Sequence, residues 1–188
     1  MRFAKVASVF LFIATISLSS AGAQAPQRTA APARRAAPAA ATAARPVATL
    51  AQLMKGILYP NANVIFFVQD KDPAKIKPAP DPSLSPDPLA STYGGWEAVE
   101  NSGLALYEAA NLLMEPGRKC SNGKAVPITN ADWPKLVQGL RDAGLAVQKA
   151  AQAKNQDQIL DVADKMTTAC SNCHDKYREK PTIAARCQ

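Results

Sequence analysis

Four stretches of the chain repeat apolar residues every three or four positions, which is the period of an amphipathic helix. They cover about residues 47–68, 93–114, 130–147 and 155–177, and no alternating strand pattern competes with them. The first stripe contains Val47, Leu50, Met54, Ile57, Asn61, Val64, Ile65 and Val68. Four such helices with mostly short links predict an all-α fold, an antiparallel four-helix bundle.

Prolines and capping residues divide these helices. Pro60 lies inside the first stretch and is expected to kink or split that helix. Pro134 follows a start signal at Asn130 to Asp132, and the fourth helix is expected to begin around Asn155 or Asp157. Between the first two helices, residues 70–92 contain six prolines, so we expect an extended loop there.

The N-terminal region has a different composition from the helical part. Residues 1–23 have the basic, apolar, small-residue order of a secretory signal peptide, with cleavage expected after Ala23. Residues 24–46 are mainly alanine, proline and arginine, which predicts a disordered tether. The domain then occupies residues 47–188. Because no other segment is long and apolar enough to span a membrane, we expect an exported, periplasmic protein.

The net charge of +7 changes this picture little. Six of the 22 basic residues precede residue 46, where there is no acidic residue, so the remaining charges almost balance the 15 acidic residues. A nucleic-acid-binding domain normally carries a basic face within its fold. We therefore expect no nucleic-acid partner.

The sequence Cys170-Ser171-Asn172-Cys173-His174 matches the C-x-x-C-H pattern of covalent c-type haem attachment. On a helix, positions i, i+3 and i+4 share a face, so two sulfurs and an imidazole can reach one haem. The sequence predicts one haem c, bound through Cys170 and Cys173, with His174 as the proximal iron ligand. A redox-active dithiol normally lies at a strand-to-helix junction, and a zinc site would need Cys120 or Cys187 in addition.

His174 is the only histidine, so a second histidine from the same chain cannot fill the sixth iron position. In an up-down-up-down bundle the end of the fourth helix lies beside the start of the first. Met54 is therefore the best candidate for a sixth ligand, and core packing beside the haem is the alternative role. Met114 fits a core position, and Met166 lies about two turns before His174 on its own helix.

Cys120 follows the second helix and Cys187 follows the fourth, which places both at the same end of the bundle. In an oxidising compartment these two residues can form a disulfide. Two free thiols are the alternative.

The closing helix, ending in Cys170-Ser171-Asn172-Cys173-His174-Asp175-Lys176-Tyr177-Arg178, resembles the class II cytochromes c, the cytochrome c′ family. The resemblance covers about residues 47–180. It implies a proximal role for His174 and places Arg178 beside the proximal haem face. The segment Leu50 to Lys55 is similar to low-spin members, in which a methionine of the first helix binds iron, although the arginine often found one turn earlier is missing.

Two functions follow from this resemblance. The first is electron transfer with redox partner proteins, through a haem with His174 and Met54 as ligands. The second is binding of nitric oxide or carbon monoxide by a five-coordinate, high-spin haem, with Leu50, Leu53 and Ile57 lining a dry distal pocket. An enzymatic role is not expected, since residues 50–58 contain no acid and no second histidine exists for proton transfer. The resemblance also allows a homodimer.

Overall fold

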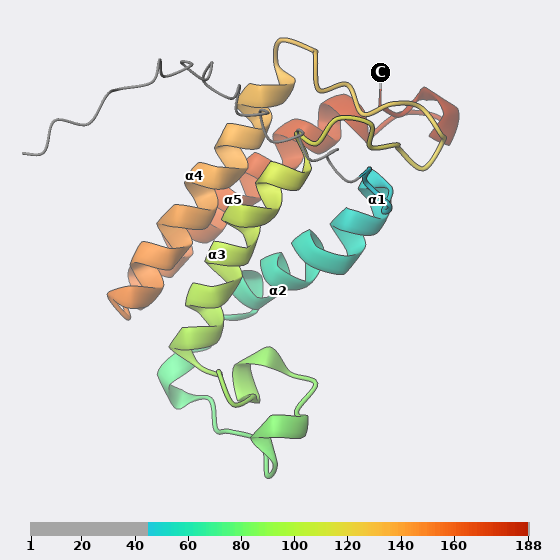
Figure 1. Ribbon diagram of the computed structural model, residues 1–188. Coiled ribbons are helices and arrows are strands. Elements are labelled where there is room, and N and C mark those ends of the chain that lie inside the picture. Colours follow the sequence, from blue (N-terminus) through green and yellow to red (C-terminus); the bar gives the residue numbers. More distant parts are fainter. Residues whose placement is uncertain (1–44, 188) are drawn as a thin grey trace, which may run out of the picture. The chain divides into compact units, whose positions relative to one another are not determined.

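The computed structural model describes residues 45–187, and within them the chain is helical with no β-strand (Figure 1). An all-α fold is therefore confirmed for this part of the chain. The predicted leader over 1–23 and nearly all of the predicted tether over 24–46 lie outside the described residues. The α-helices are α1 (Leu50–Leu53), α2 (Tyr59–Phe67), α3 (Trp96–Leu112), α4 (Trp133–Gln152) and α5 (Gln156–Tyr177).

The first helical stretch begins later than the apolar pattern predicts. Thr49 caps α1: its hydroxyl accepts from the Gln52 amide, and the Gln52 side chain accepts from the Thr49 amide. The amide of Leu50 donates to the carbonyl of Lys119. This amide of the first turn has no acceptor within the helix and finds one in the distant loop. The prediction that Val47 belongs to the buried stripe is wrong, because Val47 precedes this cap and is fully exposed.

A π-helical turn over Met54–Leu58 connects α1 to α2, and Pro60 is the second residue of α2. Proline has no amide hydrogen and cannot donate to the carbonyl four residues earlier, so the regular ladder must change near this point. The Tyr59 amide donates to the Met54 carbonyl, and the Asn61 side chain donates to the Ile57 carbonyl at 2.7 Å. The wider turn and the side-chain amide together supply partners where the proline interrupts the α-helical pattern.

The proline-rich segment 70–92 is not uniformly extended as the sequence predicts. It contains three 3₁₀ turns, Pro73–Lys75, Pro82–Leu84 and Pro88–Ala90. Each begins with a proline and is preceded by an aspartate whose carboxylate accepts from the backbone amide two residues later. Proline fixes a helical φ, and aspartate is a good cap, so the repeated Asp-Pro pair favours one helical turn rather than an extended chain.

Two glycines place the start of α3 three residues after the predicted start at Tyr93. Gly95 has a φ of +60°, and its amide donates to the carbonyl of Leu89 at 2.9 Å. A β-carbon on Gly94 would lie only 2.3 Å from the same carbonyl oxygen. The chain therefore turns sharply against the loop before the helix begins at Trp96.

The longer helices pack around a common core. α3 contacts α4, α4 contacts α5, and α2 contacts both α3 and α5 (Figure 1). The bulkiest fully buried side chains include Trp133, Ile65, Leu106, Ile159 and Met166. None of the helices in the described part of the chain is long and apolar enough to cross a membrane.

α3 and α4 approach each other closely at a pair of facing glycines. A β-carbon on Gly103 would lie 2.8 Å from the carbonyl oxygen of Gly144. A β-carbon on Gly144 would lie 2.7 Å from the carbonyl oxygen of Gly103 and 3.0 Å from the amide nitrogen of Tyr107. These neighbours are backbone atoms and cannot rotate away, so only glycine fits at this crossing.

We expect Gly144→Ala to lower the free energy of unfolding by about 1–3 kcal/mol, because overpacking must push the two backbones apart. Gly139→Ala is the matched control on the same helix, since no atom lies within 4 Å of its added β-carbon. That control should gain about 0.5–1 kcal/mol from the better helix propensity of alanine. Urea unfolding measures both variants, and equal midpoints would contradict the close contact.

Candidate functional site

The C-x-x-C-H motif lies on the last turns of α5, inside one continuous helix. Asn155 begins this helix by accepting from the Gln158 amide, as one of the two predicted capping positions requires. Cys170 and Cys173 are free thiols, and both are half-buried. Because residues i, i+3 and i+4 lie on one helical face, the two thiols and the His174 imidazole are neighbours along this surface.

A pocket of about 450 Å³ lies beside the motif. This volume falls within the usual range of cofactor sites, roughly 300–1,000 Å³. Cys170, His174 and Arg178 border the pocket from α5, and Phe66 and Gln69 border it from the end of the first helical stretch. Its other lining residues are Thr167, Ser171, Asp175 and Glu179. Phe66 and Gln69 were not among the predicted site residues, since their contribution depends on how α2 lies against α5.

Burial sets the protonation of the motif. Burial raises the pKa of the Cys170 thiol, and burial, with smaller effects of Cys170 and Asp132, raises the pKa of the Cys173 thiol to about 11. Burial, and then the Arg178 guanidinium, lower the pKa of His174 below its ordinary value of 6.5. At neutral pH both thiols are therefore protonated and the imidazole is neutral. Redox-active C-x-x-C pairs differ, because their nucleophilic thiol has a lowered pKa.

The structure places Met54 at the start of the π-helical turn, half-buried against the edge of the core. Met54 does not belong to the residues that border the pocket beside His174. Leu50 and Ile57 are also half-buried, whereas Leu53 is fully inside the core. Of the other two methionines considered, Met166 is fully buried and Met114 packs at the edge of the core.

The opposite side of the motif is attached to the start of α4. The Tyr177 hydroxyl lies 2.9 and 3.0 Å from the two carboxylate oxygens of Asp132, and Lys176 Nζ is 2.6 Å from Asp132 Oδ2. The Asn130 side chain donates to the Tyr177 oxygen, and the Tyr177 ring packs edge-on against the buried Trp133. The Lys176 and Tyr177 hydrogen bonds hold the pKa of Asp132 below its ordinary value, so the carboxylate is ionised at neutral pH.

These contacts were not predicted as part of the site. The sequence marked Asp132 only as a candidate start of α4 and Tyr177 only as a member of an apolar stripe. Nothing in the spacing of two residues 45 positions apart indicates that they touch. The combination of a polar hydroxyl and a predicted buried position was the one available signal, because a buried tyrosine normally finds a hydrogen-bond partner.

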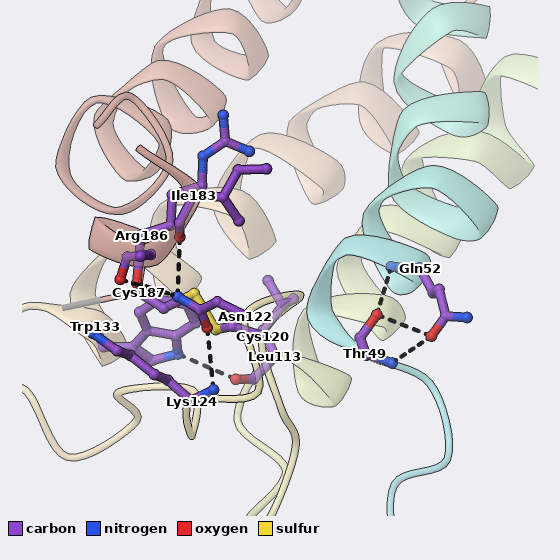
Figure 2. The surroundings of a disulfide bond; sticks show 11 residues. Thr49, Gln52, Leu113, Cys120, Asn122, Lys124, Trp133, Ile183, Arg186 and Cys187 are labelled. Carbon is purple, nitrogen blue, oxygen red and sulfur yellow. Dashed lines mark hydrogen bonds between the residues drawn. A yellow bond between two sulfur atoms is a disulfide. The ribbon is translucent and has the colours of Figure 1, made fainter. Parts of the chain in front are cut away.

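The segment after α5 folds back to the loop between α3 and α4. The Cys120 and Cys187 sulfurs are 2.07 Å apart, at the distance of a disulfide bond. Figure 2 shows this bond beside Asn122, whose side-chain amide donates to the carbonyls of Ile183 and Arg186. The Cys187 amide donates to the Tyr177 carbonyl. The tail is therefore fastened directly to the last turn of α5, one turn after His174.

Arg118 connects the same loop to the first helix and is 5 % exposed. Its guanidinium group donates to the carbonyls of Leu112 and Ala48 and forms an ion pair with Glu115 at 2.9 Å. Arginine is rarely buried, so nothing in the sequence singles out this residue. Arg118 thus holds the segment before α1 to the end of α3, and the Cys120–Cys187 bond holds the segment after α5 to the same loop.

Among the described residues, no group of three or more histidine, cysteine, aspartate or glutamate side chains is arranged to hold a metal ion. A search for similarity finds no match for this chain among protein-family models, curated proteins or solved structures.

Proposed function

We propose that the protein is an exported c-type cytochrome of the class II kind, which carries one haem bound covalently through Cys170 and Cys173. The observation that carries this proposal is the C-x-x-C-H motif on one unbroken helix, with Cys170 and His174 bordering the same pocket. His174 is the proposed proximal iron ligand, and its lowered pKa favours the neutral imidazole that coordinates metals.

The residues around the motif fit a haem in several respects. The pocket is large enough for a cofactor and opens directly against Cys170 and His174. Phe66 contributes an aromatic surface, and Arg178 borders the pocket with a guanidinium group that is ion-paired with Glu179. A haem held here supplies a one-electron iron couple, and the chain supplies attachment, the proximal ligand and partial exclusion of water.

The helical contacts support an antiparallel four-helix bundle around this site. The first helical stretch, α3, α4 and α5 would be its four members, and the contacts of α2–α3, α3–α4, α4–α5 and α2–α5 follow the order expected around such a bundle. Bundles commonly hold cofactors between facing helices. The pocket between α2 and α5 is in keeping with that arrangement.

The rival explanations of the motif receive less support. A zinc site built on Cys170, Cys173 and His174 would require Cys120 or Cys187, and these two residues are bonded to each other. A dithiol oxidoreductase would place its C-x-x-C pair at the start of a helix, where the dipole stabilises a thiolate. Here the pair lies near the helix C-terminus.

For the activity, we favour electron transfer with Met54 as the sixth ligand. Met54 begins a π-helical turn, a feature that is common at functional sites, and its side chain is only half-buried. Methionine and histidine together would raise the reduction potential and suit exchange of electrons with partner proteins. The Cys120–Cys187 pair is compatible with the oxidising periplasm that this function implies.

Spectra of the ferric and ferrous protein test this ligand. We expect low-spin wild-type spectra with a methionine-to-iron charge-transfer band, and we expect Met54→Ala to lose this band and become high-spin. Met114→Ala is the matched control, since Met114 is a second methionine at the edge of the core. High-spin wild-type spectra that are unchanged in Met54→Ala would exclude Met54 as the ligand.

The alternative is a five-coordinate haem that binds nitric oxide or carbon monoxide. One observation favours it: the pocket beside His174 is bordered by Phe66 and Gln69, and Met54 does not line it. Binding of carbon monoxide by the ferrous protein within seconds would support this alternative. No binding over hours would count against it.

A further inference from the structure

The two sides of the haem-attachment motif differ sharply in their surroundings. Cys170, His174 and Arg178 border an open pocket, whereas Cys173 is not part of the pocket wall, although both cysteines pack against the core. On this second side, one helical turn beyond Cys173, Lys176 and Tyr177 both contact Asp132. A single carboxylate from α4 thus holds the turn that follows the motif.

The contacts of Asp132 fix both the position and the rotation of this turn. Both carboxylate oxygens accept from the Tyr177 hydroxyl, and the Tyr177 ring is held against Trp133 with 4.9 Å between ring centroids. Trp133 is itself held by its indole nitrogen, which donates to the Leu113 carbonyl at 3.1 Å (Figure 2). Rotation of the end of α5 would break these contacts together, so they restrict the orientation of the preceding turn with His174.

The same contact places two opposite charges beside the motif. Lys176 and Asp132 retain 53 % and 33 % side-chain exposure, so solvent screens their mutual attraction and the pair adds little to stability. Each charge would still act on a haem attached at the motif, since the Asp132 carboxylate contributes to raising the pKa of the Cys173 thiol. A carboxylate favours the oxidised form, which carries one more positive charge, and an ammonium group favours the reduced form.

We infer that Asp132 and Lys176 position the attachment turn of α5 and adjust the reduction potential of the holoprotein in opposite directions, Asp132 lowering it and Lys176 raising it. This inference rests on the proposed haem attachment. Both are positioning residues: neither lines the pocket that borders His174.

The test measures the reduction potentials of the haem-loaded wild type, Asp132→Asn, Lys176→Gln and the double variant. We expect Asp132→Asn to increase the equilibrium constant for one-electron reduction at least about threefold at low ionic strength. Lys176→Gln should decrease it by a similar factor, and the double variant should return close to wild type. High salt should shrink both shifts, because it screens partly exposed charges.

Asp142→Asn is the matched control for charge alone. Asp142 is an exposed acid on the same helix, ten residues or about 15 Å from Asp132 along the helix axis, beyond the screening length of about 10 Å at 0.1 M salt. The reduction potential of the Asp142→Asn variant should equal that of the wild type.

Unfolding in urea provides a second measurement. Asp132→Asn and Tyr177→Phe should show a non-additive effect on the unfolding midpoint, since their side chains share a hydrogen bond.

The outcomes separate this inference from the proposed function. Protein that lacks covalently bound haem overturns both. Haem-loaded protein whose potential is unchanged in the two variants, or moves in the same direction in both, overturns the tuning role and leaves haem attachment intact. Opposite shifts that cancel in the double variant support the inference, because a general loosening of the fold cannot produce two signs.

Discussion

Protein in which both Cys170 and Cys173 are changed to serine is expected to contain no covalently bound haem, while the wild type carries one per chain. The physical reason is that serine oxygen cannot form the thioether links, so only the bond from His174 would retain the cofactor. Intact-mass measurement under denaturing conditions gives the answer directly, because unfolding releases a haem held by coordination alone. The proteins should be made in a host able to mature c-type cytochromes.

The matched control for this experiment is Asn172→Ala. Asn172 lies between the two cysteines, is exposed and occupies a position that the motif leaves open. The mass of the Asn172→Ala variant should include one haem, like that of the wild type. A wild-type mass equal to that of the processed polypeptide would reject the proposed function, whatever the behaviour of the variants.

The second large effect concerns the disulfide. Changing Cys120 and Cys187 together to serine is expected to lower the free energy of unfolding by about 4 kcal/mol, as estimated from the loop-closure entropy for a separation of 67 residues. This loss would be a large part of the total stability of an ordinary domain, about 5–15 kcal/mol. The double change should also loosen the tail, because without the disulfide the amide of residue 187 is no longer held at the Tyr177 carbonyl.

Chemical unfolding with urea measures this loss. Reduced wild type is the matched comparison, since it lacks the bond but keeps both sulfurs, and it should unfold at nearly the same urea concentration as the double variant. Equal stabilities of oxidised wild type and the double variant would contradict a stabilising role of the bond. The haem content should stay unchanged, because neither residue belongs to the C-x-x-C-H motif.

The apolar period predicted where helices occur, but neighbouring segments decided where they begin. The pattern placed Val47 on the first stripe, yet the helix begins after Thr49, where the Leu50 amide meets the carbonyl of Lys119 from a distant loop. The pattern likewise extended the second helix to Tyr93, and the turn at Gly95 against Leu89 shortened it. Contacts that a helix end makes with residues outside the helix are not encoded in its apolar period.

The proline-rich segment shows a different limit. Counting prolines correctly excluded long helices and central strands between residues 70 and 92. It missed the 3₁₀ turns, because the preceding aspartates were not considered as caps. Here the information was local and present in the repeated Asp-Pro pair.

The sequence by itself determined the helical class of the described chain and the placement of Cys170, Cys173 and His174 on one helical face. Both depend on a period of 3.6 residues within a single segment, which the order of the amino acids specifies directly. It also singled out Cys120 and Cys187 as the remaining cysteines.

Only the tertiary structure decided what surrounds that face. It brought Phe66 and Gln69 to the pocket, Asp132 to Tyr177, and buried Arg118 against the carbonyl of Ala48. These partners are tens of residues apart along the chain, and their meeting depends on the crossing of whole helices. That crossing is set by packing over many side chains, down to the two glycines between α3 and α4, and no single residue reveals it in advance.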